Sequence, residues 1–198
     1  MKLYLRADLE LFLRSVDAEL PKRIEVVIIG GAAAAVQYGF DKGTRDIDTW
    51  TGVNRDLAAA VERARVATGL AIPFQQSGVA DGPRELESRL RRALPRLRRL
   101  MAKVPERHDL VLMKTVRGYE HDLEAIEAIH RRSPLDLDVL VKRYVEEMGA
   151  VVIAPSRLKG NFLTMIERLF PRELDAVTER LASGGPKPSR RRPRSRGR

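Results

Sequence analysis

The stretch IEVVIIGGAAAAVQYGFDKGTRDIDTW, residues 24–50, decides the fold that we expect. It opens with a run of mostly β-branched apolar residues, which predicts a buried β-strand. Gly30 and Gly31 end this run, and the small apolar residues that follow contain no helix breaker before Gly39. That pattern predicts a helix packed closely on a sheet. The stretch therefore predicts a strand, a tight glycine turn and a helix in direct succession.

Two carboxylates close the same stretch, at Asp46 and Asp48 in GTRDIDTWT. Residues i and i+2 of a strand share a face, with Cα atoms roughly 6.5–7 Å apart, so both can reach one cation while Ile47 points the other way. Mg²⁺ prefers oxygen ligands and binds through one or two carboxylates together with substrate phosphates. A glycine turn at a helix N-terminus, as at Gly30 and Gly31, lets a phosphate approach backbone N–H groups.

Either feature alone fits a plainer interpretation, since a glycine pair also makes tight turns and an Asp-x-Asp pair also occurs on solvated strand edges. Their order and separation favour a site that holds metal and phosphate together. The expected cofactor is Mg²⁺ (or Mn²⁺), bound by Asp46 and Asp48.

The rest of the sequence predicts an α/β (α+β) fold, a mixed β-sheet flanked by helices with a helical C-terminal part. We expect further strands at 43–51, 70–76, 85–94 and 97–104, with helix as the competing interpretation of the last two. We expect helices at 7–20, 32–39, 54–69, 106–118, 118–132, 135–149 and 155–182, the last as one or two helices. The expected division is a core at 1–110, a helical part at 111–183 and a disordered basic tail at 184–198.

The formal net charge of +10 is unevenly distributed. The tail GGPKPSRRRPRSRGR carries seven basic residues, no acid and no large apolar residue, so it cannot contribute to a core. A second basic run, residues 84–107, contains nine Lys and Arg residues but only three Glu residues. Such segments bind phosphate backbones without reading sequence, and they equally suit a solubilising tail and a solvated face.

Several classes of site are excluded. The sequence has no cysteine, which excludes disulfides, thiolate ligands and a cysteine nucleophile. No apolar run reaches the length of a membrane span, and charges at Arg6 and Asp8 interrupt any signal sequence, so we expect a soluble cytoplasmic protein with no membrane partner. His108, His121 and His130 are not spaced as one metal site, and neither a P-loop nor a dinucleotide-binding glycine motif is present.

The segment GGAAAAVQYGFDKGTRDID resembles the signature of the nucleotidyltransferase superfamily, a Gly-Gly or Gly-Ser turn followed by Thr/Ser-x-Asp-x-Asp. It is most similar to the minimal branch that includes the AbiEii-type abortive-infection toxins and related uncharacterised nucleotidyltransferases. The resemblance implies two metal ligands, Asp46 and Asp48. The nucleotide-binding positions that it implies are Gly30, Gly31, Lys42, which stands where relatives often carry arginine, and Thr44.

A second segment, DLVLMKTVRGYEHDLEAI, resembles the downstream Lys-x-x-Arg…Asp motif of the family. Lys114 matches its lysine, and an ammonium point charge there can neutralise the β- or γ-phosphate. Arg117 follows at i+3 on the same helical face, and Asp122 is expected either to fix the lysine or to cap the next helix. Polymerising members of the superfamily use a third carboxylate on a later strand, for which Glu87 is the positional candidate here.

The leading functional hypothesis is metal-dependent transfer of a nucleotidyl group from an NTP to a hydroxyl or phosphate acceptor. The basic segments favour an RNA acceptor such as tRNA, and the resemblance implies a toxin role with a cognate antitoxin protein. One alternative is a non-catalytic relative that binds nucleotide or RNA through a degraded site. A third hypothesis is nucleotidyl transfer to a small molecule such as an antibiotic.

Overall fold

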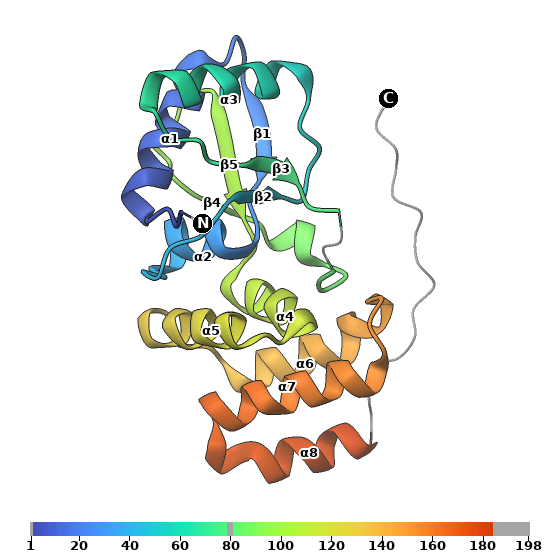
Figure 1. Cartoon of the computed structure of the whole chain (residues 1–198). Coiled ribbons are helices and arrows are strands. Elements are labelled where there is room, and N and C mark those ends of the chain that lie inside the picture. Colours follow the sequence, from blue (N-terminus) through green and yellow to red (C-terminus); the bar gives the residue numbers. More distant parts are fainter. Residues whose placement is uncertain (1, 79–80, 184–198) are drawn as a thin grey trace.

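The structure is a computed structural model that describes residues 2–78 and 81–183 (Figure 1). It is an α+β fold with a small mixed sheet and flanking helices, as the sequence predicts. Its strands are β1 (Ile24–Val27), β2 (Ile47–Thr49), β3 (Phe74–Gln76), β4 (Arg91–Arg92) and β5 (Leu100–Val104). Its α-helices are α1 (Arg6–Glu19), α2 (Gly30–Tyr38), α3 (Arg55–Thr68), α4 (Arg107–Arg117), α5 (Glu120–Arg132), α6 (Leu137–Glu147), α7 (Pro155–Leu169) and α8 (Leu174–Ser183). Short 3₁₀ helices are η1 (Leu86–Arg89), η2 (Met148–Ala150) and η3 (Pro171–Glu173).

The strands form two ladders that meet beside β1. In the first, β5 lies between β1, to which it is parallel, and β4, to which it is antiparallel. In the second, β2 pairs in parallel with β3. An antiparallel bridge between Ile28 and Thr49 places β2 next to the end of β1, where Ile29 N donates to Asp48 O at 2.9 Å. The chain thus brings the glycine turn that follows β1 directly beside the Asp-Ile-Asp segment.

Local sequence explains how the elements around the sheet begin and end. Asn54 caps α3 by accepting a hydrogen bond from Leu57 N at 2.9 Å, and Gly69 ends the helix in the left-handed conformation. The alanines of α2 are buried, because small side chains let this helix approach the sheet closely. In β2, Ile47 and Thr49 are fully buried while Asp48 is half-buried, which is the alternation expected of a strand.

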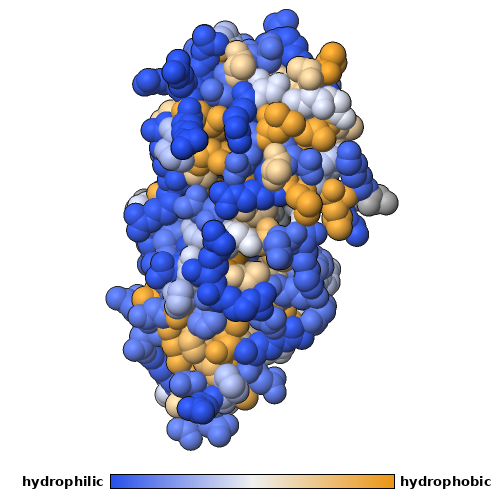
Figure 2. All heavy atoms as spheres, turned by 90° about the vertical axis from the view of Figure 1, so that its left-hand side faces the viewer, coloured by the Kyte–Doolittle hydropathy of each residue, from blue (hydrophilic) through white to orange (hydrophobic). Residues whose placement is uncertain are grey.

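The second half of the chain is helical, and α4 to α8 lie together below the sheet in Figure 1. Its core includes a stacked pair between Tyr144 of α6 and Phe162 of α7, with ring centroids 4.0 Å apart. The expected last helix is divided into α7, η3 and α8. On the side of the molecule that carries α1, hydrophilic residues predominate and the hydrophobic areas are separate from one another (Figure 2).

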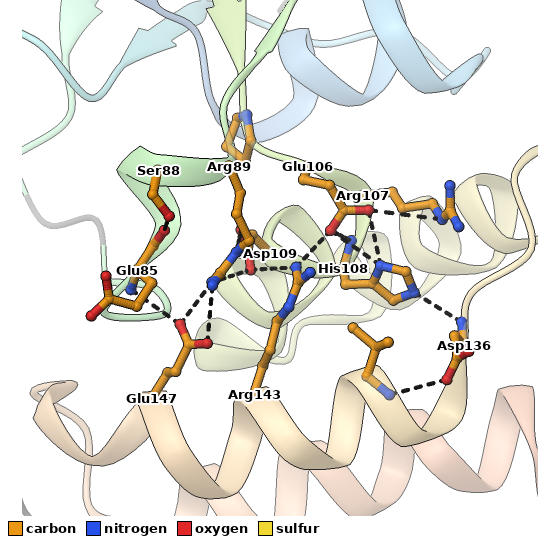
Figure 3. Close-up of polar contacts among 12 residues, drawn as sticks. Glu85, Ser88, Arg89, Glu106, Arg107, His108, Asp109, Asp136, Arg143 and Glu147 are labelled. Atoms are coloured by element: carbon orange, nitrogen blue, oxygen red, sulfur yellow. Dashed lines mark hydrogen bonds and ion pairs between the residues drawn. The ribbon is translucent and has the colours of Figure 1, made fainter.

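One strand prediction is wrong. Residues 85–94 were expected to form a strand, but residues 86–89 form η1 and only Arg91–Arg92 pair with β5. The reason is tertiary, because the side chain of Arg89 turns away from the sheet to the helical part (Figure 3). There it contacts Asp109 Oδ2 of α4 at 2.8 Å and Glu147 Oε2 of α6 at 2.7 Å.

Within residues 2–78 and 81–183, no helix is both long enough and apolar enough to span a membrane. The basic tail expected at 184–198 lies outside the described residues.

Candidate active site

The glycine turn has a backbone and a setting that require glycine. Gly30, the first residue of α2, has φ +66°, a left-handed conformation that side chains disfavour. A Cβ at Gly30 would lie 3.7 Å from Asp48 Oδ2, and one at Gly31 would lie only 2.6 Å from Thr44 Oγ1. The turn is therefore packed against Thr44, which precedes the acidic pair, and against Asp48, which belongs to it. Four sequence-predicted positions come together here.

Asp46 and Asp48 form a carboxylate pair that carries an electrostatic cost. Burial raises the pKa of Asp46 and the negative charge of Asp48 raises it further, while Arg117 and Thr44 act in the opposite direction. Two half-buried carboxylates in this relation repel each other, and a bound divalent cation would relieve the repulsion. The pair therefore suits the hard oxygen ligation that Mg²⁺ and Mn²⁺ require.

The second motif folds into a buried ionic cluster at the end of α4. Lys114 is only 4% exposed, and its Nζ contacts Asp122 Oδ1 of α5 at 3.2 Å. Arg117 contacts the same oxygen at 2.8 Å, so both cations share Oδ1. Asp122 Oδ2 is buried and accepts no hydrogen bond from the described residues. Asp122 thus fixes the lysine, which was one of its two expected roles, whereas the capping position of α5 belongs to Tyr119.

Burial lowers the pKa of Lys114, and the charge of Arg117 lowers it further, although the charge of Asp122 opposes both effects. The lysine is therefore held in an environment that does not fully compensate its charge. An anionic ligand nearby would stabilise the ammonium form.

A cavity of about 220 Å³ joins the two motifs. Gly30 and Asp48 line it from the sheet side, and Lys114 and Arg117 line it from α4. Its remaining walls are Ile29, Ser77, Asp81, Leu110, Met113 and Val116. The cavity therefore combines a glycine turn, acids and cations with an apolar wall, which is the composition of a site for an anionic ligand with an apolar part.

Asp81 lines the cavity and was not among the residues predicted from the sequence. Its Oδ2 accepts a hydrogen bond from Val152 N at 2.8 Å, and its side chain lines the cavity with Asp48. No sequence motif marks Asp81. Its hydrogen-bond partner Val152 lies far away along the chain, so local spacing could not indicate the contact. The described residues contain no group of three His, Cys, Asp or Glu side chains able to hold a metal, so Asp81 does not complete a three-acid cluster with Asp46 and Asp48 in this structure.

Two expected site residues point elsewhere. Lys42 pairs with Glu124 of α5 at 2.8 Å and does not line the cavity. Glu87 lies on η1 rather than on a strand, and it accepts a hydrogen bond from Trp50 Nε1 at 3.1 Å. Neither residue belongs to the group formed by the glycine turn, the acidic pair and Lys114.

The chain matches one family model over residues 8–169, described as "Nucleotidyltransferase of unknown function (DUF6036)". The chain belongs to this family. The matched segment includes the glycine turn, both acids and the Lys114–Asp122 pair, so it covers the candidate site described above. The chain has no significant match among curated proteins or among solved structures.

Membership of a nucleotidyltransferase family makes this protein a transferase at a coarse level, with a nucleotide as the substrate that the family description implies. The family description names no acceptor, metal or catalytic residue. Those assignments rest on the geometry of the cavity.

Proposed function

We propose that the protein transfers a nucleotidyl group from an NTP to an acceptor, with Mg²⁺ or Mn²⁺ held by Asp46 and Asp48. One observation carries the proposal. Gly30 and Asp48 are packed together, with the Cβ position of Gly30 3.7 Å from Asp48 Oδ2, and both line a cavity that Lys114 and Arg117 also line. A triphosphate and its metal require these two kinds of group on opposite sides of one space.

The residues take distinct parts in the reaction. Backbone N–H groups at Gly30–Gly31 face the triphosphate at the helix N-terminus, and Lys114 and Arg117 neutralise its negative charge. A metal bound at the acidic pair would activate the acceptor and stabilise charge on the leaving pyrophosphate. An acceptor oxygen attacks the α-phosphorus, the bond from the α-phosphorus to the bridging oxygen breaks, and pyrophosphate leaves. We assign the acceptor proton to Asp81, because it lines the cavity while Glu87 does not.

RNA, such as tRNA, is the acceptor that we favour. The basic run at residues 84–107 and the basic tail support this choice, because both suit a polyanion. The resemblance to AbiEii-type toxins supports a toxin role with a cognate antitoxin partner.

A non-catalytic nucleotide-binding protein is the second candidate. The observation in its favour is that no third acid joins Asp46 and Asp48 in a metal-binding group within the described residues. Binding of an NTP would then depend on the same residues without any turnover.

The deciding experiment measures metal-dependent pyrophosphate release from each of the four NTPs in the presence of total RNA. We expect release that chelator abolishes, and that Asp46→Asn or Asp48→Asn reduces by more than about 100-fold, because a metal contributes several kcal/mol to transition-state stabilisation. Asp56→Asn, a change to a partly exposed acid on α3, serves as the control.

Asp81→Asn should reduce release strongly, and Glu87→Gln should leave it unchanged. Binding of NTP without release, across all nucleotides and both metals, would establish the non-catalytic alternative. Full activity of Asp48→Asn would contradict the site assignment itself.

A further inference from the structure

Residues 91–99, here called the arginine loop, comprise β4 and the connection to β5. They carry five exposed arginines, Arg91, Arg92, Arg96, Arg98 and Arg99. Within the described part of the chain, none of these five forms an ion pair with an acid, whereas Arg63, Arg89 and Arg168 on other elements each contact a carboxylate. Five guanidinium groups without an ion pair partner among the described residues therefore lie within nine residues of the chain.

The loop is held in a defined shape. Asp17 of α1 accepts three backbone hydrogen bonds from it, at 2.6 Å from Arg99 N, 2.6 Å from Leu100 N and 3.2 Å from Arg98 N. Leu94 has φ +48°, the single positive φ of a non-glycine residue among those described. Such backbone strain persists only where the surrounding contacts impose it.

The five arginines divide into two groups. Arg92 Nη2 donates to Leu97 O at 3.1 Å, and Arg99 Nη1 donates to Leu20 O at 2.8 Å, so these two side chains help to hold the loop. Arg91, Arg96 and Arg98 donate no side-chain hydrogen bond to any described residue. These three guanidinium groups are available to an external ligand.

Strand register connects the loop to the cavity. Arg91 lies opposite Val104 on β5, and continuing the β1–β5 register places Val104 opposite Ile28, which bridges to Thr49. The row therefore crosses four strands and ends one residue from Asp48. Three strand spacings amount to about 14 Å. Val104, Ile28 and Thr49 are themselves buried, so a ligand that reaches both the sheet edge at β4 (Figure 1) and the acidic pair would have to pass over the surface around this row.

We propose that the arginine loop is the docking surface for the phosphate backbone of a polynucleotide acceptor. The inference rests on the proposed function in one respect, because it treats the bound polynucleotide as the acceptor of the transferred nucleotidyl group. Guanidinium forks bind phosphate oxygens in bidentate geometry, and the side chains of Arg91, Arg96 and Arg98 form no ion pair within the described residues. The loop offers no exposed aromatic or aliphatic anchor of the kind that protein interfaces use, since Leu97 is buried and Leu94 is partly buried. Contacts of this kind bind without reading sequence.

The test compares two charge-reversed variants of the full chain that have the same net charge. The first carries Arg91→Glu, Arg96→Glu and Arg98→Glu. The control carries Lys142→Glu, Arg157→Glu and Arg172→Glu, three exposed residues of the helical part that form no ion pair within the described residues. Fluorescence anisotropy measures binding of a single-stranded RNA oligonucleotide between about 50 and 200 mM salt.

We expect the loop variant to bind at least about 10-fold more weakly at low salt, and its log–log salt slope to fall by about 2, at roughly 0.7 for each lost phosphate contact. The control should keep a slope near that of the unmutated protein. Equal losses in both variants would overturn the inference, because binding would then follow net charge alone. Tighter binding of poly-glutamate than of RNA would also overturn it and indicate an acidic protein partner.

Asp17→Ala separates loop geometry from charge. This change makes the protein more positive by one charge and removes both oxygens that accept hydrogen bonds from the loop. We expect weaker RNA binding in spite of the added charge, with thermal unfolding as the check on folding. Tighter binding would contradict a preorganised surface.

NTP binding by the unmutated protein and by the loop variant is measured without RNA. Loss of RNA binding alone, with NTP binding intact, supports the docking surface. If the unmutated protein does not bind NTP, the proposed function is wrong. The RNA-binding measurements would still test whether the arginine loop is a docking surface.

Discussion

Helix α4 takes part in two buried ionic clusters of opposite character. Near its start, Asp109 is fully buried and both of its oxygens are used, Oδ1 by Arg89 and Arg143 and Oδ2 by Arg89 (Figure 3). At its end, Lys114 and Arg117 share Oδ1 of Asp122, and Oδ2 accepts no hydrogen bond from the described residues, with His121 Nε2 3.8 Å away.

The pKa values differ in the same way. Around Asp109, hydrogen bonds and ion pairs favour the charged forms of Glu106 and Arg89. Burial tends to raise the pKa of Glu106, but hydrogen bonds from His108 and Arg143 lower it to about 2. Burial tends to lower the pKa of Arg89, yet its hydrogen bonds to Asp109 and Glu147 raise it. In the cavity, burial lowers the pKa of Lys114 and the charge of Arg117 lowers it further, so the charge of this ammonium group is less well compensated.

The difference teaches how to separate a structural cluster from a site. A satisfied ionic network stabilises the arrangement of elements and has no capacity left for a ligand. A cluster with uncompensated charges and a free acceptor costs folding free energy, and that cost is recovered when a ligand binds. The four predictions that follow test this contrast, from the largest expected effect to the smallest.

Asp109→Ala should have the largest effect. It leaves Arg89 and Arg143 without their shared buried carboxylate, and breaking one partner of a buried ion pair costs about 3–5 kcal/mol of unfolding free energy. Denaturant unfolding measures the loss. Glu19→Ala, which removes the exposed partner of Arg63, should cost no more than about 1 kcal/mol. Similar losses in both variants would mean that the network is not a structural centre.

Acid should destabilise the protein through Glu106. Its pKa is about 2 in the folded state and near 4.5 when exposed, so its contribution is complete above about pH 4.5 and disappears as the pH falls toward 2. The contribution is on the order of 3 kcal/mol. Unfolding midpoints measured from pH 7 to pH 3 should fall steeply for the native chain. Glu106→Gln should start from a lower stability and show a flatter profile; an unchanged profile would contradict the assignment.

Lys114→Ala should separate binding from stability. Asp122 retains Arg117 as a partner, so we expect a modest change in unfolding free energy. NTP affinity should fall by about 1.5–3 kcal/mol, the range for a hydrogen bond to a charged group. Calorimetric titration with NTP and Mg²⁺ measures it. Lys22→Ala, at an exposed ion pair with Asp56, should leave affinity unchanged; equal affinities for both variants would remove Lys114 from the site.

Gly30→Ala should have the smallest effect on stability. Its left-handed backbone makes a Cβ unfavourable by about 1–2 kcal/mol. Gly69, at φ +67° with no atom within 4 Å of a built Cβ, is a matched control with similar backbone strain. Both variants should lose comparable stability by thermal unfolding. NTP binding should weaken in Gly30→Ala alone, because its Cβ stands 3.7 Å from Asp48 Oδ2.

The sequence by itself predicted the α+β class and the strand, turn and helix around Gly30, because these follow from local periodicity and glycine placement. The joint role that it predicted for Asp46 and Asp48 stays a prediction, because Asp46 lies just before β2 and only Asp48 lines the cavity. The Lys114–Asp122 contact could be anticipated from the family resemblance, because both residues flank one short turn between helices.

Tertiary structure alone decided the rest. Asp81 reaches the cavity through a contact with Val152, and Arg89 leaves the expected strand for Asp109 and Glu147, segments far away in the chain. In ESRLRRAL, leucines are interspersed with charged residues, which indicates a strand. This pattern is the same whether or not Arg89 pairs with a distant acid. Local sequence patterns determine which face of a helix or strand can be buried. The pairing of distant charges depends on how these buried faces pack together, and the spacing of residues along the chain does not specify that packing.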